Sequence, residues 1–281
     1  MCNLFFCTNP QSSKHSLILL STRDEILSRP TDKADWRNGV LSGVDLQDPA
    51  KGTWFAVNEQ GKVGVLLSTT QLRNDKMTKA VSRGTLAHDY LRSHDRAHEY
   101  CQSLANKAHM FNGFTFVALE RDPITGDYET HSLTNALVEN IKPISWPAGS
   151  YVIGNCPPHT TYGKMKHGRK LFEDVLNSFD DDTEEDVILQ RLIEIGHDNR
   201  KCWPDEQLSS QIDEFDPVDL SSIFVRLGTP LVYGTRCFTV LLVDKDGRAR
   251  LHEKRLVYID DEREEWKSQD FHFTCNPLSK E

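Results

Sequence analysis

The order of strand-like and helical segments limits the folds open to this chain of 281 residues. Short apolar runs at 3–7 and 16–21 flank a turn rich in Asn, Pro and Ser, which predicts a hairpin with a buried face. Helical spacing of apolar residues predicts helices over 85–105, 164–179 and 184–195. Further strands are predicted at 40–44, 53–57, 62–67, 114–119, 128–133, 223–225, 237–244 and 249–253. Strands at both ends with helices between them predict an α+β fold in which helices cover two sheets.

Composition excludes several classes of protein. The formal net charge of −9 argues against a nucleic-acid or anionic-membrane surface, and no apolar run reaches the roughly 18 residues of a membrane span. The short apolar start, soon followed by Pro10, lacks the pattern of a secretory signal. Seven cysteines without a C-x-x-C pair predict reduced thiols in the cytoplasm and no metal site. We expect one domain, 1–281, with the polar, turn-rich segment 200–221 as a surface loop or insertion.

Cys2 follows the initiator methionine, so removal of that methionine would place a thiol and a free α-amine on one residue. The ordinary pKa of the thiol is about 8.5 and that of the amine about 7.7–8.0. Near neutral pH the amine is therefore partly unprotonated and could act as the base that a nucleophile needs. The alternative is a small second residue without a catalytic role.

Charged residues follow the second predicted strand. A hairpin would return this end of the strand to the start of the first one, which brings Arg23 and Asp24 near Cys2. Arg23 would lower the pKa of the thiol, as basic neighbours do, and Asp24 would hold the α-amine or the arginine. The alternative is a solvated strand end with a local ion pair.

A series of short motifs follows Cys2 in a fixed order. They are Arg23-Asp24-Glu25 with Ser28-Arg29-Pro30, Leu41-Ser42-Gly43-Val44-Asp45, Gly52-Thr53-Trp54, Ser82-Arg83-Gly84, Phe111-Asn112-Gly113-Phe114, the stretch Tyr151 to Asn155, and Tyr233-Gly234-Thr235-Arg236. In these motifs the chain resembles the Transport and Golgi Organization 2 family, the NRDE proteins, from residue 1 to about residue 255.

The family is similar to N-terminal nucleophile (Ntn) hydrolases of the bile-salt hydrolase and penicillin-acylase type. The resemblance implies an αββα sandwich of two mainly antiparallel sheets between helical layers. It implies Cys2 as nucleophile and α-amine base, with Arg23 and Asp24 orienting or tuning it. Asn155 would donate to an oxyanion, and Arg236 would complete the pocket. A preorganised oxyanion donor is worth about 2.7–4 kcal/mol in such sites.

The chain departs from the family pattern at several polar positions. Thr22 stands where the family has Asn, and Lys51 replaces the second Gly before Gly-Thr-Trp. A common Thr-Asn reads Leu67-Ser68, and Tyr-Gly-Leu-Ser-Asn reads Tyr-Val-Ile-Gly-Asn at 151–155. The nucleophile and Asn155 are kept, while part of the polar shell around them is lost.

Two functions follow as alternatives. The first is an Ntn hydrolase that cleaves an amide or acyl-thioester bond with Cys2. The second, which the lost polar shell favours, is a protein that binds and moves a small hydrophobic metabolite. The family implies roles in intracellular haem trafficking, lipid or acyl-CoA homeostasis and Golgi organization, with a cytoplasmic location and mitochondrial or Golgi association. Haem would then be cargo and no cofactor is required.

A Cys-Pro pair gives the haem hypothesis candidate ligands. Cys156 precedes Pro157, and His159 lies close by in the sequence. A thiolate or an imidazole can ligate haem iron. The alternative is an ordinary loop dipeptide, in which case the pocket would hold a porphyrin by apolar contact alone.

Overall fold

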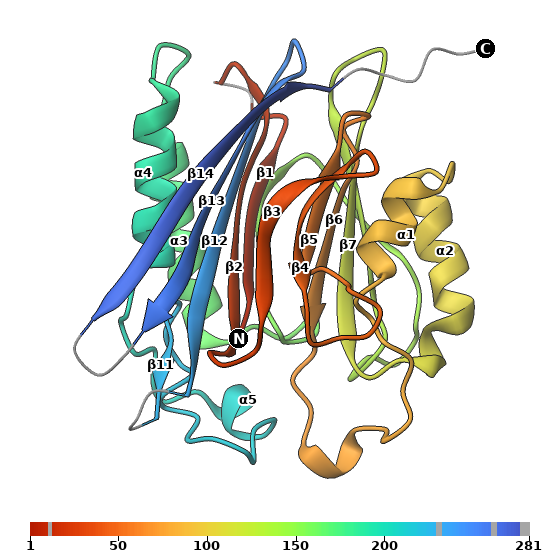
Figure 1. The fold of residues 1–281 in the computed structure, drawn as a ribbon, viewed down its shortest axis with the longest axis vertical. Helices are drawn as coiled ribbons and strands as arrows, with labels where there is room; N and C mark the ends of the chain where they lie inside the picture. The colour runs from red at the N-terminus through yellow and green to blue at the C-terminus, as the bar shows by residue number, and fades with distance from the viewer. Residues whose placement is uncertain (11–12, 229–231, 260–262, 276–281) are drawn as a thin grey trace.

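A computed structural model describes residues 1–10, 13–228, 232–259 and 263–275 of the chain. Within these residues two seven-stranded antiparallel sheets face each other (Figure 1). α3 and α4 cover the outer face of one sheet, and α1 and α2 cover the outer face of the other (Figure 1). The predicted α+β fold with an αββα sandwich is therefore confirmed. None of the helices in the described ranges is long and apolar enough to cross a membrane.

The first sheet combines strands from both ends of the chain. Its strands, in spatial order, are β10 (Gly149–Ile153), β1 (Asn3–Thr8), β2 (His15–Ile26), β12 (Tyr233–Asp244), β13 (Arg248–Ile259) and β14 (Glu264–Thr274), and β11 (Arg226–Leu227) pairs with β12. β1 and β2 form the predicted hairpin, in which Asn3 lies opposite Thr22. Because β12 pairs with the other edge of β2, the end of β2 lies between the start of β1 and the start of β12.

The second sheet is a meander in sequence order. Its strands are β3 (Thr31–Arg37), β4 (Val40–Asp45), β5 (Phe55–Asn58), β6 (Val63–Ser68), β7 (Phe114–Arg121), β8 (Tyr128–Thr134) and β9 (Ile144–Trp146). The helices are α1 (Leu86–Arg92), α2 (Ala97–Lys107), α3 (Gly163–Leu176), α4 (Glu185–Gly196) and α5 (Glu206–Ser209), with short 3-10 turns η1 (Arg73–Asp75) and η2 (Ala108–Met110).

β1 is buried on both faces, which explains its continuous apolar sequence. Leu4 and Phe6 belong to the core between the two sheets. Phe5 and Cys7, on the opposite face, pack in the core beneath α3 and α4. A third core lies between α1, α2 and the second sheet. The start of the chain is thus held from both sides in the centre of the molecule.

The predicted helix over 85–105 is wrong as a single element, since the structure has α1 and α2 with a break between them. Side chains from the β5–β6 turn bind the backbone at this break. Asn58 Nδ2 donates to the Leu91 carbonyl at 3.0 Å, and Lys62 Nζ donates to the carbonyls of Ser93 at 3.0 Å and Asp95 at 2.6 Å. These bonds satisfy carbonyls that a continuous helix would use itself.

Several other strands differ from the sequence expectation. Residues 223–225 were predicted as a strand but lie outside any strand, and pairing begins only at β11. β3, β9, β10 and β14 were not predicted. Segment 200–221, predicted as a surface loop or insertion, contains α5 and buries Leu208 and Leu220.

A close approach of two glycines holds the loop before β5. The Thr53 N–H donates to the Gly84 carbonyl at 2.8 Å, and a Cβ on Gly52 would overlap the Gly84 backbone. We expect Gly52→Ala to lower the free energy of unfolding by about 1–3 kcal/mol, because the loop must shift to admit the methyl group. Urea denaturation measures this.

Lys51→Ala is the matched control for this substitution. Lys51 is exposed and already has a φ of 48°. Its truncation should change stability by no more than about 0.5 kcal/mol. Equal effects of the two substitutions would contradict the close-approach explanation.

Candidate active site

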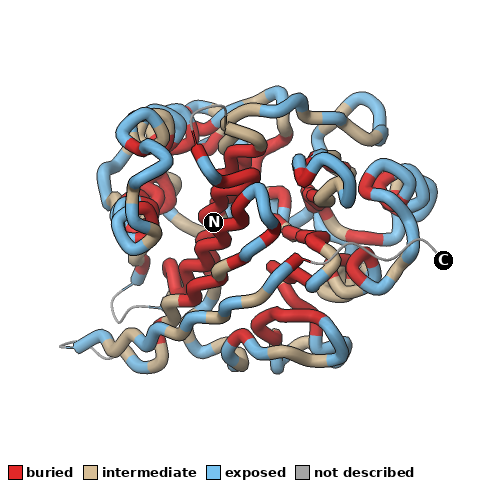
Figure 2. The backbone as a smooth tube through the Cα atoms, turned by 90° about the horizontal axis from the view of Figure 1, so that it is seen from above, coloured by how far each residue is buried: buried red, intermediate tan, exposed pale blue. Residues whose placement is uncertain are grey.

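A cavity of about 600 Å³ opens where β1 begins and β2 ends. Its walls come from the start of the chain, the end of β2, the loops after β4 and β6, and segments 76–84 and 211–215. Both sheets therefore contribute to it. The chain start lies against buried strands near the middle of the molecule (Figure 2).

The α-ammonium of Met1 is bound inside the protein. It donates to Asp24 Oδ2 at 2.6 Å and to the Tyr233 hydroxyl at 2.6 Å. The Met1 side chain is buried in an apolar cluster, where its sulfur accepts a hydrogen bond from Thr70 Oγ1 at 3.3 Å. Burial lowers the pKa of this α-ammonium, and the Asp24 carboxylate opposes the shift. Asp24 is therefore the carboxylate partner of the α-amino group.

Cys2 lines the same cavity and is half-buried. The hairpin register brings its thiol to the Asp24 main-chain carbonyl, 3.7 Å from Sγ. Burial raises the pKa of the thiol, and the adjacent α-ammonium acts in the opposite direction. Asp24 thus contacts Met1 through its carboxylate and Cys2 through its backbone.

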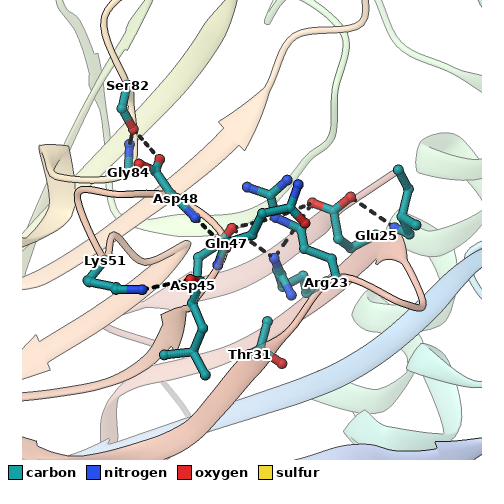
Figure 3. Close-up of polar contacts among 12 residues, drawn as sticks. Arg23, Glu25, Thr31, Asp45, Gln47, Asp48, Lys51, Ser82 and Gly84 are labelled. Carbon is teal, nitrogen blue, oxygen red and sulfur yellow. Dashed lines mark hydrogen bonds and ion pairs between the residues drawn. The ribbon is translucent and has the colours of Figure 1, made fainter.

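Arg23 also lines the cavity, as the hairpin predicts. Its guanidinium lies 4.0 Å from the centre of the Trp54 ring, and Nη2 is 3.5 Å from Asp45 and 3.6 Å from Glu25. Arg29 completes this charged cluster through its 2.7 Å contact with Asp45. Arg23, Glu25 and Asp45 are labelled in Figure 3. Of the charged groups that lower the pKa of the Cys2 thiol, Arg23 acts less than the α-ammonium. The guanidinium of Arg23 is paired with the carboxylates of Glu25 and Asp45.

Asn155 lies at the cavity wall just after β10, where it faces Ser68. Its Nδ2 donates to the Ser68 carbonyl, and its main-chain oxygen accepts from Thr70 N at 2.8 Å. Asn155 Oδ1 is buried and has no hydrogen-bond partner among the described residues. One of the two amide N–H groups is therefore occupied, and one is left for another acceptor.

Arg236, expected from the resemblance to complete the pocket, is directed elsewhere. It donates to the carbonyls of Ile26 at 3.1 Å and Arg29 at 2.7 Å, and to Thr31 Oγ1 at 3.2 Å. The register of β12 against β2 shifts between Thr235 and Cys237, on either side of Arg236. Arg236 thus fastens the β2–β3 connection behind the cavity wall and is absent from the lining formed by the described residues.

The two candidate haem ligands are not brought together. Cys156 is only 5% exposed and packs in the apolar cluster that contains Met1, where burial raises the pKa of its thiol. His159 is exposed and lines a separate hollow of about 340 Å³ with Lys142 and Pro158. Nor does any group of three or more His, Cys, Asp or Glu in the described ranges have the arrangement of a metal site.

Three residues that depart from the family pattern, Thr22, Lys51 and Ser68, take part in local hydrogen bonds. Thr22 Oγ1 accepts from both the main chain and the side chain of Asn3, at 3.1 and 2.8 Å. Lys51 has a φ of 48°, a conformation that glycine adopts without strain, and its Nζ binds the Leu46 carbonyl at 2.7 Å. Ser68 provides the carbonyl that binds Asn155.

Comparison with known proteins identifies the family. The family model of Transport and Golgi organisation 2 matches residues 1–258. The chain belongs to this family. It is 29% identical to the Transport and Golgi organization 2 homolog of Mus musculus, over 98% of this chain and 99% of that protein. It is 30% identical to Transport and Golgi organization protein 2 of Drosophila melanogaster, over 92% and 94%.

Solved structures support the fold. A variant of conjugated bile acid hydrolase from Clostridium perfringens superposes with a TM-score of 0.53, over 99% of both chains and at 9% identity. This chain of the Transport and Golgi organisation 2 family thus has an Ntn-hydrolase-type fold.

Sequence reasoning missed two side chains at this family site. Tyr233 lies in the motif Tyr-Gly-Thr-Arg at 233–236, but this motif does not indicate that the Tyr233 hydroxyl binds the α-ammonium. Lys164 is 1% exposed, donates to the Ser222 carbonyl at 3.1 Å, and lies close enough to Asp24 and Cys2 for their charges to affect it. The position of Lys164 on the buried face of α3, next to Met165 and in line with Phe172, is the feature of the sequence that could have indicated its burial.

Lys164 makes stability depend on pH. Burial lowers its pKa from 10.5 to about 8, so the folded state carries this charge at a cost below pH 8. The unfolded state binds more protons between about pH 8 and 10.5, and wild-type stability should rise with pH there. Relative to Lys164→Met, the wild type should gain up to about 3 kcal/mol from pH 7 to pH 10, measured by urea denaturation.

Lys166→Met removes an exposed lysine from the same helix and is the control. A stability difference between Lys164→Met and wild type that stays constant from pH 7 to pH 10 would contradict the buried-lysine explanation.

Proposed function

We propose that the protein is an N-terminal-cysteine hydrolase that cleaves an amide or acyl-thioester bond with Cys2 as nucleophile. One observation carries the proposal: Asp24 and Tyr233 bind the α-ammonium of Met1, each at 2.6 Å, at the cavity that Cys2 lines, and the same two groups would receive the α-amine of Cys2 once Met1 is removed. A buried carboxylate and a hydroxyl directed at the chain terminus are what an α-amine base requires for its orientation.

The mechanism begins with removal of Met1, which leaves the α-amine on Cys2. The amine accepts the thiol proton while Sγ attacks the carbonyl carbon of the substrate. Collapse of the tetrahedral intermediate breaks the C–N or C–S bond, and the leaving group takes the proton from the amine. A water molecule deprotonated by the same amine then hydrolyses the acyl-enzyme thioester and frees Cys2. The second N–H of Asn155 is available to the oxyanion in both steps.

The charged lining of the cavity favours a hydrolase over the carrier of a hydrophobic metabolite that the sequence favoured. Arg23, Asp24, Glu25, Arg29 and Asp45 all contribute charged groups to it. A purely apolar ligand would remove water from these groups without replacing their hydrogen bonds, which is costly. A substrate with polar groups beside its scissile bond fits this lining better.

Intact mass and active-site labelling test the hydrolase. We expect the mature protein to lack Met1 and to form an acyl adduct on Cys2 with an activated thioester. Cys2→Ala should abolish adduct and turnover, and Asp24→Asn should lower turnover by about 100-fold or more, because the amine loses its carboxylate.

Cys202→Ala is the control, since Cys202 is the other partly exposed thiol in the described ranges. It should leave the adduct and turnover unchanged. Retention of Met1 in the mature protein, or acylation of Cys202 in place of Cys2, would refute the hydrolase.

A second function is supported by the apolar part of the cavity lining. In this function the cavity would serve in binding and trafficking of a hydrophobic metabolite, haem or an acyl-CoA or lipid. The apolar side chains of the lining are Trp54, Leu66, Ile212, Phe215 and Leu220.

Haem titration followed by the Soret band tests this carrier. Saturable binding by the wild type is expected, weakened about tenfold by Phe215→Ala through loss of aromatic contact. Cys156→Ala should leave binding unchanged, because the Cys156 thiol is buried outside the cavity lining formed by the described residues. Absence of saturable binding would exclude direct haem carriage.

A further inference from the structure

Arg83 differs from the other cationic side chains that line the cavity. Arg23 and Arg29 contact Glu25 and Asp45, and a further lysine on the lining, Lys76, is paired with Glu214 at 3.1 Å. Arg83 forms no ion pair with a carboxylate of the described residues, although it lines the same cavity. Its one side-chain hydrogen bond to the described part of the chain runs from Nη1 to the Gly113 carbonyl at 2.5 Å. The guanidinium has five N–H donors, so most of them remain available.

The backbone on both sides of Arg83 is firmly held. Ser82 Oγ donates to the Asp48 carboxylate and also accepts from Gly84 N at 3.1 Å. The Gly84 carbonyl accepts from Thr53 N at 2.8 Å (the Ser82–Asp48–Gly84 contacts are drawn in Figure 3). The side chain therefore extends from a fixed stretch of backbone, so this loop need not become ordered when a ligand binds.

The neighbouring acids do not neutralise Arg83. Asp48 is occupied by Ser82 and by Ala50 N, which donates to it at 2.9 Å. Glu25 accepts from Ile26 N at 2.8 Å and contacts Arg23 and Arg29. Burial lowers the pKa of Arg83, which means that its charge is held in the wall without full compensation. An uncompensated, partly buried cation is a cost that an anionic ligand would relieve.

We propose that Arg83 binds an anionic group of the substrate, a carboxylate or phosphate, and thereby places the scissile carbonyl at Cys2. The identification of this ligand as a substrate rests on the proposed hydrolase function. Guanidinium groups bind such anions through paired N–H donors, which fix orientation as well as position. A cavity of about 600 Å³ has room for a small molecule that reaches from Arg83 to Cys2.

Alkylation of Cys2 tests the proposal without requiring hydrolysis. Iodoacetate carries a carboxylate and iodoacetamide does not, and both react with the thiolate. The ratio of their rates at Cys2, measured by site-resolved mass spectrometry, is therefore independent of the thiol pKa in each variant. Arg83→Gln should lower the iodoacetate-to-iodoacetamide ratio by about tenfold. Lys76→Gln, which removes a paired cation from the same lining, should change it less than twofold.

Protection experiments identify the anion. Acetate or inorganic phosphate should slow alkylation of Cys2 by iodoacetamide in the wild type, and the effective anion names the group that Arg83 binds. Arg83→Gln should lose the protection, and Arg83→Lys, which keeps the charge without the paired donors, should keep only part of it.

An unchanged ratio in Arg83→Gln, an equal drop in Lys76→Gln, or no protection by either anion would overturn the proposal. If Arg83→Gln fails to fold, full protection of Cys2 by the anion in Arg83→Lys would overturn the proposal. These outcomes are distinct from failure of the hydrolase, which is read from Met1 removal and acyl transfer.

Discussion

The ion pair between the α-ammonium at the chain start and Asp24 is the contact on which the geometry of the site depends; in the structure this amine belongs to Met1, and in the proposed mature enzyme it belongs to Cys2. It joins the start of β1 to the end of β2, and Tyr233 at the start of β12 adds a second acceptor. Three neighbouring strands therefore meet at one amine. Removal of one partner from such a buried pair leaves the other charge uncompensated, at a cost of about 3–5 kcal/mol. The cavity exists where it does because this junction holds the strand ends in place.

The parts of the fold that sequence reasoning predicted are those with local signals. β1 has a continuous apolar run because both of its faces are buried, and the hairpin with β2 placed Arg23 and Asp24 beside Cys2. The parts it missed depend on distant contacts. The break between α1 and α2 is bound by Asn58 and Lys62, and β14 is a half-exposed strand whose mixed polar sequence carries no strong strand pattern.

The same distinction applies to the candidate site. Neighbours of Cys2 on the hairpin follow from strand register, which a sequence can indicate. The direction of the Arg236 side chain follows from a register shift in β12, which the residue types of this segment do not indicate. The polarity of the cavity depends on how carboxylates and guanidinium groups from several loops pair with one another, and only the folded chain decides that pairing. Arg83 has no carboxylate partner among the described residues, so its charge is available to a ligand.

The enclosed amine also limits what can be attached to the chain. An acetyl group on Met1 would remove the positive charge and leave the Asp24 carboxylate alone in a buried position. A peptide fused ahead of Met1 would replace this ammonium by an uncharged amide N–H, with the same consequence for Asp24. Affinity tags and fluorescent proteins placed at this end would therefore disturb the very region whose chemistry they were meant to report.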